Sequence, residues 1–109
     1  MAKLSEIQHR FETASYREHC LRRIIQRGID PATIREATFS PEAEVFECYA
    51  NDPLGPSCLV LGWWNDGKPL HIEYALGSRL YIVTVWDPSV DPKDRWEPDF
   101  KTRRKDRGN

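Results

Sequence analysis

The hydrophobic period of the chain changes at Ser40–Pro41, and this change limits the folds that the chain can adopt. Before this point, apolar residues recur at spacings of three and four, which is typical of helices with one buried face. After it, apolar and polar residues alternate in short runs bounded by turn residues, which is typical of strands in consecutive hairpins. Helices followed by strands predict an α+β domain, with the helices on one face of an antiparallel sheet of about four strands.

Three helices are expected before the change, and two of them have clear start or stop signals. Ser15 and Glu18 have the spacing of a capping box, and Gly28 is a good C-terminal stop for the helix between them. Asp30 is an N-cap residue followed by a proline at the first helical position. The three helices are therefore expected to begin near Ser5, to span Tyr16–Arg27, and to begin at Pro31.

Four strands are expected after the change. The run SCLVLGWW at 57–64 is apolar enough to lie inside a sheet. The segment Asn65–Lys68 reads as a hairpin turn because Asp66–Gly67 tolerates positive φ angles. The expected strands cover residues 45–49, 57–64, 70–76 and 79–86.

The length of the chain, 109 residues, leaves room for a single hydrophobic core. We expect one domain over residues 1–109, with its core at about 15–100 and a mobile basic tail at 101–109. Trp96 and Phe100 are expected to anchor the segment that follows the last strand. No apolar run is long enough to span a bilayer, and the first residues lack the apolar stretch of a secretory signal. A cytoplasmic location without a membrane partner is expected.

The charge distribution excludes a uniformly basic nucleic-acid binder, although it allows local basic faces. The net charge is −1, and five basic residues with one acidic residue lie between Lys101 and Arg107. This basic tail fits a contact with RNA or with an acidic partner, and it fits a solvated end equally well.

The three cysteines are an odd number without a CxxC motif, which suits a reducing compartment. Their spacing does not support a zinc site, and no metal or other cofactor is expected. The favoured interpretation is that Cys20, Cys48 and Cys58 are small buried apolar residues.

One edge of the expected helix at 16–27 carries a candidate phosphate site. At about 100° per residue, Tyr16, His19, Arg23 and Arg27 line up along one side of its apolar stripe. Arginine grips phosphate through two parallel hydrogen bonds, and histidine transfers protons near neutral pH. From spacing alone the favoured alternative is structural, with the arginines paired to surface carboxylates and His19 capping or packing.

His71 is the second candidate. In the expected strand 70–76, Leu70 and Ile72 share one face and His71 lies on the other, near a strand end that a ligand can reach. Metal-free RNA cleavage needs a base, an acid and a cation, so a nuclease would require His71 and His19 to meet around one phosphate. A lone strand histidine is more often structural. Exposed aromatic residues of the sheet could stack on bases, and the candidates are Trp63, Trp64, Tyr74, Tyr81 and Trp86.

Several runs of the sequence resemble one family. The run YREHCLRRIIQRGID at 16–30 resembles the signature of the domain-of-unknown-function family 4258. The later stretches DPLGPSCLVLGW, GKPLHIEYAL and LYIVTVWDP, followed by Trp96, are similar to the family's remaining blocks in the same order. The resemblance covers roughly residues 15–100.

That family resembles RelE/ParE-type ribonuclease toxins, so the resemblance implies their fold and a metal-independent endoribonuclease of a toxin–antitoxin pair. RNA and an antitoxin protein would then be the partners. Together with the helix edge, the resemblance assigns catalytic roles to His19, His71 and Arg23. It assigns RNA or phosphate contacts to Arg27, Tyr16 and Trp86, with Trp86 in a position where tyrosine is common. The alternative is a non-catalytic protein- or RNA-binding domain on a degenerate toxin fold.

Overall fold

The computed structural model describes residues 2–50, 53, 55–90 and 96–102. Within these residues the chain forms α-helices, one short 3-10 helix and strands, so the expected α+β class is confirmed. No helix in the described residues combines the length and apolar character needed to cross a membrane. The elements are α1 (Ala2–Arg10), η1 (Phe11–Thr13), β1 (Ser15–Tyr16), α2 (Glu18–Gln26), α3 (Pro31–Thr38), β2 (Glu44–Tyr49), β3 (Ser57–Trp64), β4 (Lys68–Leu76) and β5 (Leu80–Trp86).

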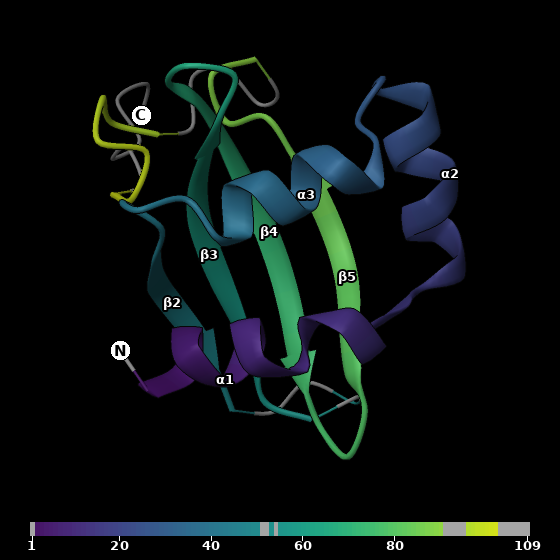
Figure 1. Cartoon of the computed structure of the whole chain (residues 1–109). Helices are drawn as coiled ribbons and strands as arrows, with labels where there is room; N and C mark the ends of the chain where they lie inside the picture. Colours follow the sequence, from purple (N-terminus) through teal and green to yellow (C-terminus); the bar gives the residue numbers. More distant parts are fainter. Residues whose placement is uncertain (1, 51–52, 54, 91–95, 103–109) are drawn as a thin grey trace, which may run out of the picture.

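The strands form one sheet in the order β1–β5–β4–β3–β2. Figure 1 shows β2, β3, β4 and β5 side by side in this sheet. Every pair is antiparallel except β1 and β5, which run parallel. The expected number of four strands is therefore wrong by one, and the RelE/ParE-like fold is not shown. The additional strand, Ser15–Tyr16, has two residues, which is too short for an alternating pattern to reveal it. β3 is an interior strand, as its apolar sequence predicts.

The turn between β3 and β4 confirms the expected hairpin. Asn65, Asp66 and Gly67 all have positive φ angles, of 47°, 62° and 107°. Glycine adopts this region at no steric cost, and asparagine and aspartate tolerate it better than other residues. The register then pairs Trp64 with Lys68 across the turn.

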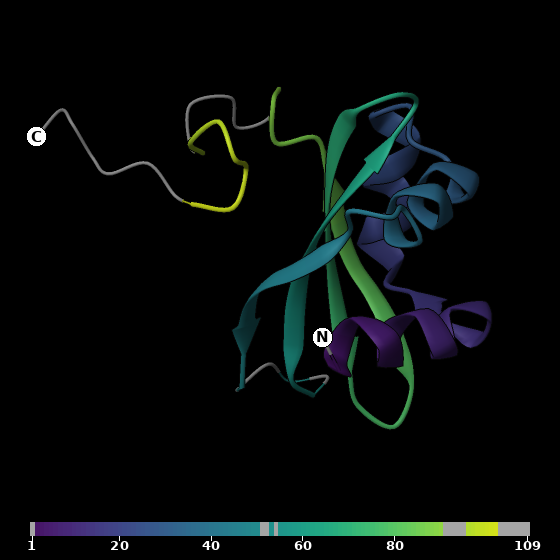
Figure 2. The ribbon, with the colours of Figure 1, turned by 60° about the vertical axis from the view of Figure 1, so that its left-hand side comes forward.

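All three α-helices cover the same face of the sheet, as expected (Figures 1 and 2). Ile7 of α1, Ile24 of α2 and Ile34 of α3 are each at most 2% exposed and belong to one core cluster. Ile7 belongs to this cluster although it precedes the expected core at about 15–100. The strand residues of this core include Val60, Leu70, Ile72, Tyr74, Ile82 and Val85.

The start of α2 differs from the expected capping box. Its N-cap residue is Arg17, whose side chain makes no capping hydrogen bond. Ser15 lies in β1 instead, where its hydroxyl accepts a hydrogen bond of 3.2 Å from Arg79. The pairing of β1 with β5 draws Ser15 into the sheet and away from the helix.

The end of α2 and the start of α3 follow the sequence signals. The N–H groups of Gly28 and Ile29 donate to the carbonyls of Ile25 and Ile24 at 3.2 and 2.9 Å. These two hydrogen bonds together form a Schellman motif, and Gly28 has the positive φ of 70° that the motif requires. The Asp30 carboxylate accepts a 2.9 Å hydrogen bond from the Thr33 N–H and caps α3 as predicted.

Residues 96–102 lie over the face of the sheet that the helices leave open (Figure 2). Trp96 is 4% exposed, and its ring lies edge-on to that of Phe46 in β2. The ring of Phe100 lies edge-on to that of Trp63 in β3, with 6.2 Å between the ring centroids. Trp96 and Phe100 therefore anchor this segment, as predicted.

The first two residues of the expected mobile tail are held in place. Lys101 forms a 2.9 Å ion pair with Glu44 of β2. Thr102 donates hydrogen bonds to the Asp99 carboxylate through its N–H and its hydroxyl, at 3.0 and 2.9 Å. These contacts tie Lys101 and Thr102 to the rest of the described chain, and the remainder of the expected tail, 103–109, lies outside the described residues.

Candidate functional site

The outer side of α2 carries three of the expected site residues. His19 and Arg23 are exposed, and Arg27 at the helix end is half-buried. Spacings of four place them one after another along the helix. Within the described part of the chain, the side chains of His19 and Arg23 have no hydrogen-bond or ion-pair partner. We call these three residues the basic edge.

Arg27 joins the basic edge to the sheet. Its Nη1 atom donates a 2.6 Å hydrogen bond to the carbonyl oxygen of Val85 in β5. β1 pairs only with Tyr81 and Ile82, so this carbonyl lies on the part of β5 beyond β1. A guanidinium has five N–H donors and can serve several acceptors at once. Arg27 therefore has a structural contact in addition to any contact with a ligand.

Tyr16 lies at the start of the basic edge but is half-buried and packs against the core. Burial raises the pKa of its phenol, and the nearby Cys20 thiol adds to the rise. Burial also raises the pKa of Cys20 to about 11, although the charge of Arg27 acts in the opposite direction. Both groups are therefore protonated and neutral near pH 7.

His71 of β4 is fully buried inside a group of aromatic rings. The centroid of its ring lies 4.8 Å from that of Phe46, 5.4 Å from that of Trp86 and 4.6 Å from that of Trp96. Its Nε2 atom is 2.6 Å from the carbonyl oxygen of Phe100. We call the rings of Phe46, Trp86 and Trp96, from β2, β5 and the C-terminal segment, the aromatic box.

The structure does not bring His19 and His71 together. Leu70 and Ile72, the neighbours of His71 in β4, face the helices and share a core with Ile24 of α2. Because successive side chains of a strand point to opposite faces, the sheet separates His71 from α2. Trp86 lies beside His71 in the aromatic box. Catalytic roles for His19, His71 and Arg23 stay predictions.

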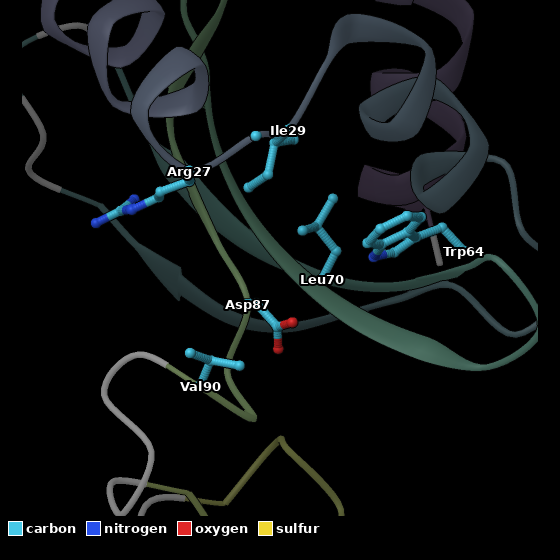
Figure 3. Close-up of a pocket in the computed structure, with 7 residues that line it drawn as sticks. Arg27, Ile29, Trp64, Leu70, Asp87 and Val90 are labelled. Atoms are coloured by element: carbon cyan, nitrogen blue, oxygen red, sulfur yellow. The ribbon is translucent and has the colours of Figure 1, made fainter.

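A cavity of about 350 Å³ lies at the end of α2, and we call it the end cavity (Figure 3). Arg27 of the basic edge is one of its lining residues. The other lining residues are mostly apolar and come from the α2–α3 connection, β3, β4 and the segment after β5. They are Gly28, Ile29, Trp64, Leu70, Asp87 and Val90.

The sequence did not identify this cavity. Trp64 was only one of several sheet aromatics, and Ile29, Leu70 and Val90 read as ordinary apolar residues. The cavity exists because the Schellman turn at Gly28 brings Ile29 under the helix end and against the end of the β3–β4 hairpin. No spacing rule connects such distant segments. The sequence signal nearest to the cavity was Gly28, which predicted the end of the helix at 16–27.

Metal chemistry has no candidate among the described residues. They contain no group of three or more histidine, cysteine, aspartate or glutamate side chains that could hold a metal ion. Cys48 and Cys58 face each other across β2 and β3, and Cys48 is exposed. The expectation that all three cysteines are buried is therefore wrong for Cys48.

The model of one protein family, described as domain of unknown function DUF4258, matches residues 16–87, which is more than half of the chain. The chain belongs to the DUF4258 family. No curated protein and no solved structure matches the chain. The DUF4258 match begins at Tyr16, runs through α2 and the sheet, and ends at Asp87. It therefore includes the basic edge and most of the end cavity, whereas Trp96 and Phe100 lie beyond it.

Proposed function

We propose that the chain binds single-stranded RNA, with a phosphate on the basic edge and an adjoining base in the end cavity. The observation that carries this proposal is the position of Arg27, which ends the basic edge and also lines the cavity. A phosphate held by Arg23 and Arg27 would lie beside an apolar hollow. The volume of this hollow, about 350 Å³, is at the small end of the range for ligand pockets.

Both parts of the proposed site have suitable chemistry. Guanidinium groups form charge-assisted, often bidentate, hydrogen bonds to phosphate oxygens. Ile29 and Trp64 provide apolar contact area for the flat face of an unstacked base. The carboxylate of Asp87 is an acceptor, so it can receive a hydrogen bond from the amino group of a base.

The net charge of the chain implies that the attraction to RNA comes from a local group of basic residues. With a net charge of −1, the chain has no overall attraction for a polyanion, so binding depends on the basic edge itself. For a single strand, neutralising one phosphate gives a slope of roughly −0.7 in a plot of log affinity against log salt concentration. We expect a slope of this size, and a slope near zero would argue against phosphate contacts.

The test compares two arginines on α2 that differ in position. A fluorescent single-stranded RNA oligonucleotide is titrated with the chain and with its Arg23→Gln and Arg22→Gln variants. Arg22 lies outside the basic edge and pairs with Glu18 at 3.3 Å on the solvent side. Arg23→Gln should weaken binding by roughly fivefold to tenfold, as expected for one exposed charge-assisted contact, while Arg22→Gln should not change it. Equal effects of the two variants would overturn the proposal.

Cleavage of the bound RNA, and with it the toxin assignment, is tested by incubating the same RNA with the chain and with two histidine variants. His19 is the imidazole next to Arg23, and the position of His71 does not support a joint role with it. Cleavage that is lost in His19→Ala but kept in His71→Ala would support a nuclease at the basic edge. Intact RNA, without growth arrest on expression, would support binding alone.

A protein partner is the second candidate function, and a different flank of α2 favours it. Leu21 and Ile25 are 43% and 75% exposed, and their spacing of four places them side by side. Exposed apolar pairs of this kind are typical of protein contacts. Ile25→Asp should abolish binding of the protein encoded by the adjacent gene, where an antitoxin would be found, and leave RNA binding intact.

A further inference from the structure

Two cysteines of the sheet are positioned as a reactive pair. Cys48 of β2 and Cys58 of β3 are direct partners in the antiparallel register. Their Sγ atoms lie 2.7 Å apart, although both are free thiols. This separation is only about 0.7 Å longer than the covalent S–S bond of a disulfide.

The backbone also fits a disulfide at this place. Directly opposed residues of antiparallel strands have Cα atoms roughly 4.5–5.5 Å apart. Disulfides accept Cα separations of about 4.4–6.8 Å, so the spacing of directly opposed residues falls within the range that a disulfide needs. Cys20, the third cysteine, is a buried residue of α2 and belongs to the core cluster. α2 contacts β5, whereas β2, which carries Cys48, is the strand at the opposite edge of the sheet from β1.

The two thiols differ in access to solvent, and burial makes one of them a weaker acid than usual. Cys48 is exposed, and Cys58 is fully buried. Burial, together with the hydrogen bond and the charge of Cys48, raises the pKa of Cys58 to about 12. Thiolates are the reactive species, so an external reagent meets Cys48 first.

We infer that Cys48 and Cys58 form an intramolecular disulfide by exchange with a small-molecule disulfide of the glutathione type. The Cys48 thiolate attacks one sulfur of the reagent, forms a mixed disulfide and releases the first reagent thiolate. The Cys58 thiol gives its proton to that thiolate, attacks Sγ of Cys48 and expels the second reagent thiolate, which takes a proton from water. The Cys48 thiol had supplied a proton to water on ionising, so in total two protein thiols are oxidised and one reagent disulfide is reduced to two thiols.

The bond would fasten β2 to its neighbour. Within the described residues, β2 is an edge strand of the sheet and pairs only with β3. A link between residues ten positions apart closes a short loop and reduces the freedom of the unfolded chain. We expect the oxidised chain to melt at a higher temperature than the reduced chain.

The test treats the full chain with oxidised glutathione and follows intact mass, peptide mapping and melting temperature. The wild type and Cys20→Ser should lose two hydrogen atoms and yield a peptide pair linked through Cys48 and Cys58. Cys58→Ser should stop at a glutathione adduct on Cys48, and Cys48→Ser should react far more slowly. Circular dichroism of each variant checks that it is folded.

Three results would overturn the inference. The first is a wild type that stops at the adduct on Cys48, because Cys58 would then not reach it. The second is an internal link that includes Cys20. The third is folded Cys48→Ser protein that reacts as fast as the wild type, because the buried thiol would then be the point of attack.

Discussion

The Nε2 atom of His71 lies 2.6 Å from the carbonyl oxygen of Phe100, a residue 29 positions further along the chain. A carbonyl oxygen only accepts hydrogen bonds, so Nε2 carries a hydrogen atom and donates it. The bond joins the middle strand of the sheet to the C-terminal segment, and the aromatic box surrounds it. His71 therefore fastens residues 96–102 to the sheet.

Replacing His71 with alanine should destabilise the fold. The variant leaves a hollow among the rings and removes the donor to Phe100, which together should lower the free energy of unfolding by about 2–4 kcal/mol. Urea denaturation measures this change. His19→Ala is the control, because an exposed side chain without partners should contribute within about 0.5 kcal/mol. A stable His71→Ala protein that has lost an RNA-cleaving activity would instead support a catalytic role.

Local signals predicted those parts of the fold that depend on neighbouring residues. Gly28 and Asp30 end and start helices as expected, and Asp66–Gly67 forms the hairpin turn, because each signal acts within a few residues. The strand at Ser15–Tyr16 could not be predicted because two residues show no period, and its partner is β5.

The candidate site was less predictable because it depends on how distant segments cover the sheet. The alternation in β4 correctly placed His71 opposite Leu70 and Ile72. It did not indicate that Trp96 and Phe100 would close over His71, since both come from a segment beyond the last strand. The basic edge on α2 was predictable from helical spacing, whereas the end cavity beside Arg27 was not.

A methyl group at Gly62 should push α3 away from the sheet. A Cβ atom added to Gly62 in β3 would overlap the backbone carbonyl oxygen of Ala37, which cannot move independently of the helix. Overpacking of this kind typically costs about 1–3 kcal/mol, so Gly62→Ala should lower stability by that amount. Amide hydrogen exchange should show the largest loss of protection in α3. Unchanged protection there would show that the sheet absorbs the strain.

The hydroxyl pair of Thr38 and Tyr74 should contribute measurably to stability. Both side chains are fully buried, and their oxygens lie 2.6 Å apart. The Thr38 hydroxyl donates to the carbonyl of Ile34 at 2.8 Å, so the Tyr74 hydroxyl donates to Thr38. Tyr74→Phe should therefore cost about 1 kcal/mol. A double-mutant cycle with Thr38→Val measures the coupling, and additive effects would contradict this arrangement.

The same tyrosine should make the fold sensitive to high pH. Burial is the main cause that raises the pKa of Tyr74 above its usual range. The unfolded chain then loses this proton at about pH 10, while the folded chain keeps it, so stability decreases as the pH rises above that value. Melting temperatures between pH 9 and 11, roughly the range around the ordinary tyrosine pKa, should fall less steeply for Tyr74→Phe than for the wild type.

Acid should loosen the C-terminal segment through Asp99. Its carboxylate accepts hydrogen bonds from the N–H groups of Lys101 and Thr102 at 2.9 and 3.0 Å, and these bonds lower its pKa. A lowered pKa means that the stabilisation is present above the unfolded value of about 3.9 and is lost as the pH falls through the lower folded value. The indole N–H signal of Trp96 in an NMR titration should therefore shift below about pH 4, before global unfolding. Asp99→Asn should remove this step, whereas Asp66→Asn in the β3–β4 turn should keep it. A step that persists in Asp99→Asn would show that another acidic group holds the segment.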